Sequence, residues 1–438
     1  MVIDRWECEQ LKMLGGWLLV YGRRKVGKTW LLRRCVEWDV YVVVGRDGFC
    51  WVERRGGGVE RLGVDECLEL VGRVVRGGGT VVLDEFQRLP LGSWDFLALL
   101  RQEAEGRLVL CGSSLGIVSR VFEPRSPLLG ILAPVRIDIA GMADTIASLA
   151  RFMGPRDAVL WAVVARDPWL LGLVEPRGDP LDVLAARARE LSLAASALVG
   201  EVFGEEERQL TRLYDAVLRL LASGLWSSKA LAAHLYNAHL ISSPSPGIVT
   251  GVLAQLEAVG LAAKIPLWRT RGARYYYKHR SPLLALLYAA LDQIEELDQP
   301  PTRDQLLKTY ALELQFSLGE LLAQHHAAQQ AYTILPGPEG DIDIVLLDRR
   351  KRPLIAYEVK LGKAEPEDAK RLKQRAEKLG IARIGIVALG GADQETRDLV
   401  DELVTPEKLV QIATTIAAKQ RRQPLNATAT TKQGILEG

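Results

Sequence analysis

Residues 18–30, LLVYGRRKVGKTW, decide the fold of the first part of the chain. An apolar run stops at Gly22, a basic turn follows, and Gly27-Lys28-Thr29 completes the pattern G-x-x-x-x-G-K-[ST]. This pattern predicts a buried strand, then a phosphate-binding loop whose N–H groups point inward, then a helix that starts near Lys28. The alternative is a glycine-rich turn that binds nothing. We predict a site for ATP or ADP formed by Gly22, Arg23, Arg24, Lys25, Val26, Gly27, Lys28, Thr29 and Trp30.

The stretch TVVLDEFQRL, residues 80–89, supplies the second half of such a site. Its apolar run ends in Asp84-Glu85, which places two carboxylates at the C-terminal tip of a predicted central strand, where open α/β sheets bind ligands. We expect Asp84 and the Thr29 hydroxyl to hold Mg²⁺, and Glu85 to polarise the attacking water. An acidic pair that merely opens a surface loop is the alternative.

Length, charge and apolar content limit the classes of protein to which this chain can belong. A chain of 438 residues is too long for one core, so about two to four domains are expected. The formal net charge is +2, so any nucleic-acid surface must be local. No apolar run is long enough for a membrane span and the first residues do not resemble a signal peptide, which predicts a cytoplasmic protein. The sequence is compatible with an oligomer.

The cysteines predict neither a metal cluster nor a disulfide framework. They are odd in number and lack a C-x-x-C spacing. We therefore expect buried thiols in a reducing compartment at all five positions, which are Cys8, Cys35, Cys50, Cys67 and Cys111.

Four motifs carry a resemblance to a known family: residues 22–29, 84–87, 111–114 (CGSS) and 126–130 (SPLLG). Together they resemble the archaeal P-loop ATPases of the AAA superfamily, distant relatives of origin-recognition initiators and signal-transduction ATPases. The resemblance implies that Asp4-Arg5 is the family's N-terminal motif, although from the residues alone a solvated helix start is the better interpretation. Ser113 or Ser114 can sense the γ-phosphate, or simply end the strand.

The chain also departs from that family. Ile131 stands where the family usually has arginine, and residues 165–168, ARDP, replace its usual Gly-Gly-x-Pro. No arginine acting in trans is identified, and the candidates are Arg120, Arg125 and Arg136.

Helical periodicity over 143–204 predicts a lid, and 205–298 reads as three helices and a two-stranded ribbon, which predicts a winged helix. The ribbon is basic and aromatic, so it can bind the phosphate backbone of DNA. Winged helices also contact proteins, and charged wings can simply be solvated. The predicted DNA contacts are Arg269, Arg271, Arg274 and Lys278.

After the linker QPPT, residues 302–410 predict helix, three strands, helix and strand, then a last helix at 393–403. Asp343, Glu358 and Lys360 are predicted to share one sheet face, where carboxylates gather Mg²⁺ at a phosphodiester and the lysine assists the water. Glu320 on the first helix is predicted to complete the site. The pattern is similar to restriction-endonuclease-like nucleases; the alternative is salt bridges in an inactive relic. His325-His326 are expected to be surface residues.

We therefore predict an α/β chain with a P-loop NTPase core, a helical lid, a winged helix, a restriction-endonuclease-like α/β domain and a flexible tail. Its predicted function is that of an ATPase that binds DNA and carries a metal-dependent nuclease. The alternatives are a signalling or initiator-like switch whose nuclease-like domain serves only for docking, and a scaffold without activity. The predicted domains cover 1–142, 143–204, 205–298, 302–410 and 411–438.

Overall fold

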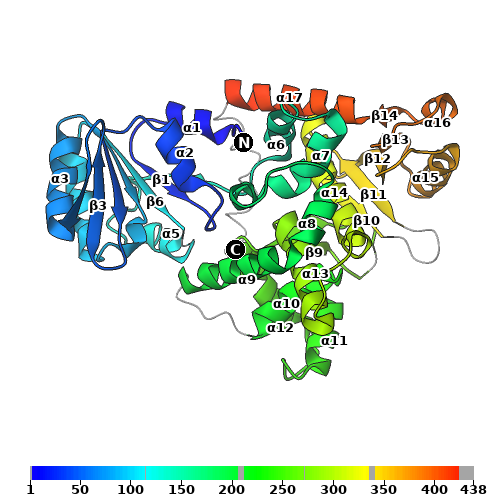
Figure 1. The fold of residues 1–438 in the computed structure, drawn as a ribbon, viewed down its shortest axis with the longest axis horizontal. Helices are drawn as coiled ribbons and strands as arrows, with labels where there is room; N and C mark the ends of the chain where they lie inside the picture. The colour runs from blue at the N-terminus through cyan, green and yellow to red at the C-terminus, as the bar shows by residue number, and fades with distance from the viewer. Residues whose placement is uncertain (1, 114, 206–211, 271, 335–340, 424–438) are drawn as a thin grey trace. The chain divides into compact units, whose positions relative to one another are not determined.

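The computed structural model describes residues 2–113, 115–205, 212–270, 272–334 and 341–423 (Figure 1). The chain divides into two compact units. The N-terminal unit holds Arg5–Ile139 and residues 198–205, and the C-terminal unit holds residues 2–4, Ala140–Ala197 and 212–419. Among the described residues, no helix combines the length and the apolar character that crossing a membrane requires.

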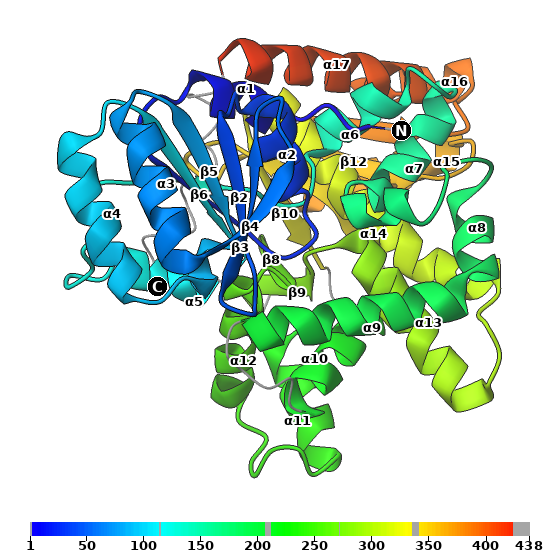
Figure 2. The same cartoon turned by 60° about the vertical axis from the view of Figure 1, so that its left-hand side comes forward.

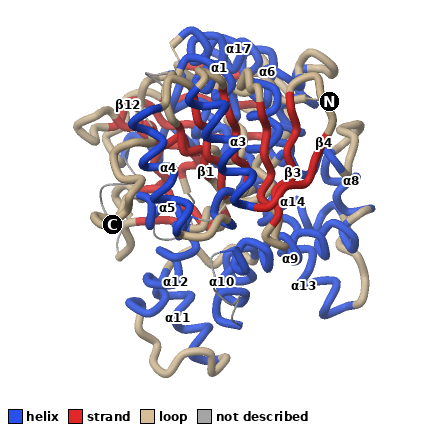
Figure 3. Tube along the Cα trace, turned by 90° about the vertical axis from the view of Figure 1, so that its left-hand side faces the viewer, coloured by secondary structure: helices blue, strands red, loops and turns tan. Residues whose placement is uncertain are grey.

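The N-terminal unit is built on a seven-stranded sheet of order β4-β3-β2-β5-β6-β1-β7. Five strands run parallel, and β3 and β4 form an antiparallel hairpin beside β2. Figure 3 labels β1, β3 and β4 among the strands of this sheet. The central strands are buried throughout, as continuous apolar runs in a parallel sheet require. The strands are β1 Leu18–Tyr21, β2 Val40–Val44, β3 Phe49–Arg54, β4 Val59–Gly63, β5 Thr80–Asp84, β6 Arg107–Gly112 and β7 Ala133–Arg136.

Helices cover both faces of this sheet, as α/β architecture demands (Figure 2). One core packs α3 and α4 against the strands through Cys67, Val71 and Trp94. The other packs α1 and α2 through Leu11 and Leu31. The helices are α1 Glu7–Met13, α2 Lys28–Cys35, α3 Val64–Arg76, α4 Gly92–Glu103 and α5 Leu115–Val121, with a 3-10 turn at Phe86–Arg88. The strand, loop and helix predicted around the phosphate-binding pattern are confirmed.

Two cysteines depart from the prediction of free thiols. Cys8 of α1 and Cys35 of α2 form a disulfide across a sequence separation of 27 residues. The cysteine spacing in the sequence could not predict this disulfide, because α1 and α2 come together only when both helices pack on the sheet. Cys50, Cys67 and Cys111 are free and buried, as predicted.

The first half of the C-terminal unit is helical. Helices α6 Met142–Leu149, α7 Pro155–Ala165 and α8 Pro180–Ala186 lead into α9 Ala188–Glu205, whose last residues belong to the N-terminal unit. Three further helices follow, with an antiparallel pair of strands and a long helix: α10 Arg212–Ala222, α11 Ser228–Asn237, α12 Pro246–Ala258, β8 Ala262–Pro266, β9 Tyr275–His279 and α13 Pro282–Leu297.

The second half of the C-terminal unit is a five-stranded sheet of order β10-β11-β12-β13-β14. Helix α14 packs on β10 and β11, and α15 packs on β12 and β13. The elements are α14 Arg303–His325, β10 Gln329–Thr333, β11 Ile342–Leu347, β12 Pro353–Lys360, α15 Pro366–Lys378, β13 Ile384–Ala388, α16 Gln394–Asp398, β14 Glu402–Val404 and α17 Pro406–Arg422.

The end of the chain corrects two predictions. The helix expected at 393–403 is a short helix, α16, followed by an additional parallel edge strand, β14. The tail expected from residue 411 is helical as far as Arg422, because α17 buries Leu409, Ile412 and Ala413. Residues 424–438 of the predicted tail lie outside the described residues.

The disulfide has a measurable consequence. Cys35→Ser is expected to destabilise the N-terminal unit by about 2–4 kcal/mol, because it frees the unfolded chain from the cross-link. Urea unfolding with and without a reductant measures this: reduction should destabilise the wild type by the same amount and leave Cys35→Ser unchanged. Cys111→Ser is the control and should retain the sensitivity to reductant. A wild type indifferent to reductant would contradict the cross-link.

Candidate functional site

The backbone between β1 and α2 has the shape of an anion-binding loop. Gly22 has φ +153° and Gly27 has φ +92°, and Lys25 between them also has a positive φ. A Cβ on Gly22 would lie 1.9 Å from the carbonyl oxygen of Ile137, so no side chain fits there. Gly27 is the residue before α2, so the N-terminus of that helix faces the loop.

Lys28, Thr29 and Asp84 come together beside this loop. Lys28 is buried, and its Nζ donates to the carbonyl oxygens of Gly22 at 2.8 Å and Arg23 at 3.1 Å. The Thr29 hydroxyl donates to Oδ2 of Asp84 at 2.7 Å. The structure therefore brings together the hydroxyl and the carboxylate that the sequence predicts to hold Mg²⁺.

Tyr41 is a member of this site that sequence reasoning missed. Its hydroxyl donates to the same Oδ2 of Asp84, at 2.8 Å. Burial and the neighbouring Asp84 carboxylate raise the pKa of Tyr41, so the phenol stays a donor. The backbone N–H of Glu85 donates to the other oxygen, Oδ1. Asp84 is thus held in one orientation from both sides, although β2 shows no signal in sequence beyond its apolar run.

Glu85 occupies a left-handed backbone conformation, with φ +59°, just after β5. Its carboxylate accepts a hydrogen bond from Nε2 of Gln87 at 2.7 Å and lies 3.2 Å from the Arg88 guanidinium. Gln87 also contacts the hydroxyl of Ser113 at 3.3 Å. The structure links the predicted base to one of the two predicted sensor serines, and Ser114 lies outside the described residues.

Arg5 is buried, not solvated, and supports the loop from behind. Its guanidinium donates to the carbonyl oxygens of Val26 at 2.9 Å and Asp138 at 2.8 Å, and pairs with Glu7. The interpretation of residues 4–5 as a solvated helix start is therefore wrong for Arg5, since the neighbouring helix gives no hint of these distant carbonyls.

Among the remaining predicted loop residues, Arg24, Lys25 and Trp30 lie toward the surface, whereas Arg23 and Val26 are buried. Arg24 pairs with Glu201 of α9 at 2.7 Å. The Trp30 side chain is exposed and has the Arg34 guanidinium over its ring. Of the three candidate arginines, Arg136 lies 3.6 Å from Asp138, and Arg120 and Arg125 are exposed.

The β8–β9 hairpin corrects part of the predicted DNA surface. Lys278 is buried and forms an ion pair of 2.5 Å with the buried Glu313 of α14. Arg269 donates to the carbonyl oxygen of Leu379 at 2.7 Å. The hairpin packs on the five-stranded sheet, where the N–H of Trp268 donates to the carbonyl of Tyr332. The Lys278 side chain is buried, whereas the Arg269 side chain is exposed.

Lys278 is therefore committed within the C-terminal unit, and the prediction that it contacts DNA is wrong, whereas Arg269 is exposed and its predicted contact with DNA stays a prediction. Burial lowers the pKa of Lys278 and raises that of Glu313, while their mutual attraction opposes both shifts. Arg274 is exposed, and Arg271 lies outside the described residues.

Asp343, Glu358 and Lys360 do converge in the C-terminal unit. The register pairs Ile344 with Tyr357, which sets Asp343 opposite Glu358 on the face that α15 covers. Lys360 Nζ lies 3.3 Å from Glu358 Oε1, and Asp343 Oδ2 accepts the N–H of Val359 at 2.8 Å. The prediction that these side chains share one sheet face agrees with this geometry.

Two residues of α15 belong to the same cluster and were missed. Arg375 lies 2.9 Å from Glu358 Oε2 and also donates to the carbonyl of Asp341. Asp368 lies 2.9 Å from Lys360 Nζ. Both side chains lie on the side of the amphipathic helix α15 that packs against the sheet.

Glu320 is placed elsewhere, which corrects its assignment to this cluster. It pairs with Arg166, the residue after α7, at 2.9 Å. Helix α14 packs on the opposite sheet face, where His326 meets Tyr357. The Gln315 amide of α14, by contrast, donates to the backbone carbonyl of Asp343 at 2.7 Å. Glu320 follows five residues later, so its side chain is rotated by about 140° around the helix axis from that of Gln315.

Burial sets the charge of this cluster. Burial, and then the neighbouring Glu358 carboxylate, raise the pKa of Asp343 to about 7, against the pull of Arg375 and Lys360. Burial alone would lower the pKa of Lys360, but its contacts with Asp368 and Glu358 outweigh it and leave that pKa raised. A divalent cation would have to compete with a proton on Asp343 near neutral pH.

No family model and no curated protein matches the sequence. Among solved structures, the chain is similar to a Walker-type ATPase of Pyrococcus abyssi, with 18% identity, 66% of this chain and 96% of that chain covered, and TM-score 0.44. It is also similar to the Aeropyrum pernix ORC2 protein with ADPNP and ADP (14%, 70% and 90%, 0.39) and to the Aeropyrum pernix ORC1 protein in complex with DNA (19%, 66% and 92%, 0.29).

The raised pKa of Asp343 predicts a pH dependence of stability. Its carboxyl titrates at about 7 in the folded chain and near 3.8 when unfolded, so the folded state binds the extra proton between these values. Stability should therefore fall as the pH rises through this window, and Asp343→Asn should flatten the fall.

Urea unfolding at pH 5 and pH 8 measures the effect. The control is Asp348→Asn, because backbone N–H groups lower the pKa of that half-buried carboxylate and it is ionised at both values. An Asp343→Asn profile as steep as that of the wild type would contradict the assignment.

Proposed function

We propose that the chain is an ATPase of the P-loop class, with ATP as substrate and Mg²⁺ as cofactor. The observation that carries this proposal is the contact between the Thr29 hydroxyl and Asp84, beside a loop that holds the buried Lys28. A hydroxyl and a carboxylate at this separation suit the octahedral oxygen shell of Mg²⁺, which bridges phosphate oxygens when bound.

Each residue then has a role that its contacts support. The Lys28 ammonium now rests on the carbonyl oxygens of Gly22 and Arg23, and it is expected to leave them for the phosphates. Tyr41 keeps Asp84 oriented, and Glu85 orients the water with Gln87 and Ser113 behind it. Inward N–H groups of the loop and the N-terminus of α2 stabilise negative charge.

Hydrolysis by purified variants tests this assignment. Lys28→Ala should lower kcat for ATP about a hundredfold or more, because it removes the cation that stabilises the developing charge. Tyr41→Phe should raise the Mg²⁺ concentration that hydrolysis requires, because Asp84 loses an orienting hydrogen bond, while the fold stays intact. Lys12→Ala is the matched control, since Lys12 is exposed and pairs with Glu9 of the same helix. Unchanged hydrolysis by Lys28→Ala would contradict the proposal.

We propose a second activity, metal-dependent cleavage of DNA, for the cluster of Asp343, Glu358 and Lys360. The specific observation in its favour is that two carboxylates and a lysine meet on one sheet face although their elements are separate in the chain. Such carboxylates can hold Mg²⁺ at the scissile phosphate, and the lysine can stabilise the charge that develops there.

Arg375 bears on whether this cluster cleaves. Its guanidinium occupies one oxygen of Glu358, and a metal ion would have to displace it or share that carboxylate. If it cannot, the cluster is an ion-pair network and the domain serves for docking, as in a signalling or initiator-like switch. Among the predicted wing contacts with DNA, exposed Arg269 and Arg274 remain part of the proposal.

Cleavage of supercoiled plasmid with Mg²⁺ or Mn²⁺ separates these cases. We expect nicking by the wild type, loss in Asp343→Asn, and a gain in Arg375→Ala if the guanidinium competes with the metal. Asp348→Asn controls for loss of surface charge. Cleavage that persists in Asp343→Asn, or is absent in both the wild type and Arg375→Ala, would contradict the nuclease and favour docking.

A further inference from the structure

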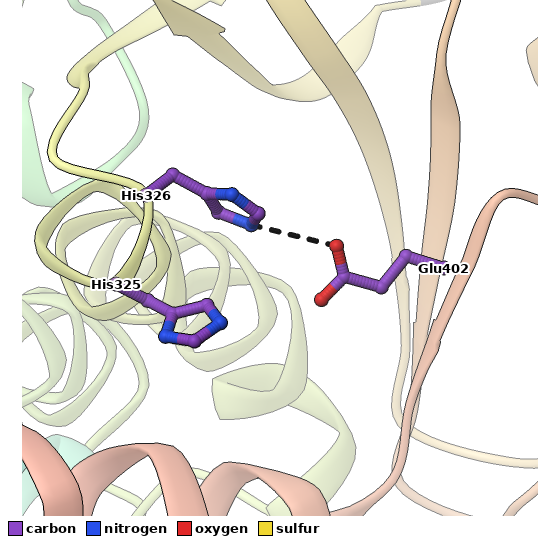
Figure 4. A group of neighbouring side chains, drawn as sticks. All are labelled: His325, His326 and Glu402. Carbon is purple, nitrogen blue, oxygen red and sulfur yellow. Dashed lines mark ion pairs between the residues drawn. The ribbon is translucent and has the colours of Figure 1, made fainter.

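Three side chains on the α14 face of the five-stranded sheet form a cluster that neither proposed activity uses. His325 is the last residue of α14, His326 follows it, and Glu402 begins β14. Figure 4 shows both imidazoles and the carboxylate turned toward one another. One donor atom from each lies within 4.8 Å of the others.

The closest pair has the spacing of metal ligands. His326 Nε2 and Glu402 Oε2 are 3.4 Å apart, which is long for a hydrogen bond between charged groups. Two ligands bound to Zn²⁺ at about 2.0–2.1 Å in tetrahedral geometry lie roughly 3.3–3.4 Å from each other. The His325 ring is exposed at the helix end, so a change of rotamer can bring its nitrogen to the same distance.

Tyr357 supplies the supporting contact that such sites need. Its ring is buried in β12, and its hydroxyl lies 2.8 Å from both His326 Nε2 and Glu402 Oε2. The phenol donates to the carboxylate, which fixes the direction of the Glu402 oxygen, and His326 Nε2–H donates to the phenol oxygen in turn. A metal ion bound to His326 Nε2 would therefore displace this proton. Outer contacts of this kind orient metal ligands and tune their affinity.

We propose that His325, His326 and Glu402 bind a transition-metal ion of the Zn²⁺ class. Two imidazoles and one carboxylate are the ligands preferred by Zn²⁺, whereas Mg²⁺ and Ca²⁺ take oxygen alone. Three protein ligands leave a tetrahedral ion one position for water or an anion. The ion would connect the end of α14 to the edge strand β14, two segments that are far apart in the sequence.

Nearby cationic side chains limit the affinity of this cluster for a divalent metal ion. Burial and the neighbouring His326 lower the pKa of His325, and the charge of Lys408 of α17 lowers it further. Burial raises the pKa of Tyr357, and the charge of Arg383 opposes this shift. Both cationic side chains repel a divalent ion, so the charge of Glu402 is the main compensation. Removing Lys408 should therefore strengthen binding, while removing a ligand abolishes it.

Metal titration of the full chain, freed of metal with a chelator, tests the site. We expect one equivalent of Zn²⁺ by calorimetry, and visible absorption typical of tetrahedral geometry when Co²⁺ replaces it. Both should vanish in His326→Ala and Glu402→Gln. Tyr357→Phe should weaken Zn²⁺ binding about tenfold, and Lys408→Gln should strengthen it.

Two controls make the result specific. His234→Ala changes an exposed histidine of α11 and should bind Zn²⁺ as the wild type does. Asp343→Ala removes the other candidate metal ligand and should also bind normally, so failure of the nuclease proposal leaves this one standing. If His326→Ala does not fold, His325→Ala takes its place, because that side chain is exposed. Absence of saturable binding, or equal binding by the ligand variants, would overturn the proposal.

Discussion

The close approach of Gly22 to the carbonyl of Ile137 is the constraint on which the nucleotide site depends. No Cβ fits at Gly22, so the chain after β1 turns sharply, and the next residues curl around the Lys28 ammonium. That turn delivers Thr29 to the carboxylate of Asp84. The sheet order then matters, because β1 and β5 both flank β6 and end at one edge.

The C-terminal unit depends on helix α14 in the way that the nucleotide site depends on Gly22. One face packs on the five-stranded sheet, where His326 reaches Tyr357. The other face carries Glu313 and Glu320, seven residues apart and so on one side of the helix, which pair with Lys278 and Arg166. Ion pairs this buried contribute little net stability, but breaking one leaves an unpaired buried charge. The helix therefore joins the preceding helices, the hairpin and the sheet into one unit.

The parts of the site that could be predicted from the sequence are those formed by residues close together in the chain. The loop from Gly22 to Thr29 and the pair Asp84-Glu85 are contiguous, so their pattern carries both the backbone shape and the chemistry. The shared face of Asp343 and Glu358 followed from strand alternation alone. Tyr41, Arg5 and Arg375 gave no such signal, since their roles come from carbonyls and carboxylates supplied by distant segments. The disulfide and the burial of Lys278 were missed for the same reason: each depends on which surfaces pack together.

Calorimetric titration of Gly22→Ala with MgATP is the most direct test of the account. The account predicts that the substitution leaves the chain folded, because one methyl group at a loop disturbs only its neighbours, yet abolishes measurable MgATP binding by forcing the loop away from Ile137. Wild-type affinity in a folded Gly22→Ala chain would contradict the claim that this close approach shapes a nucleotide site.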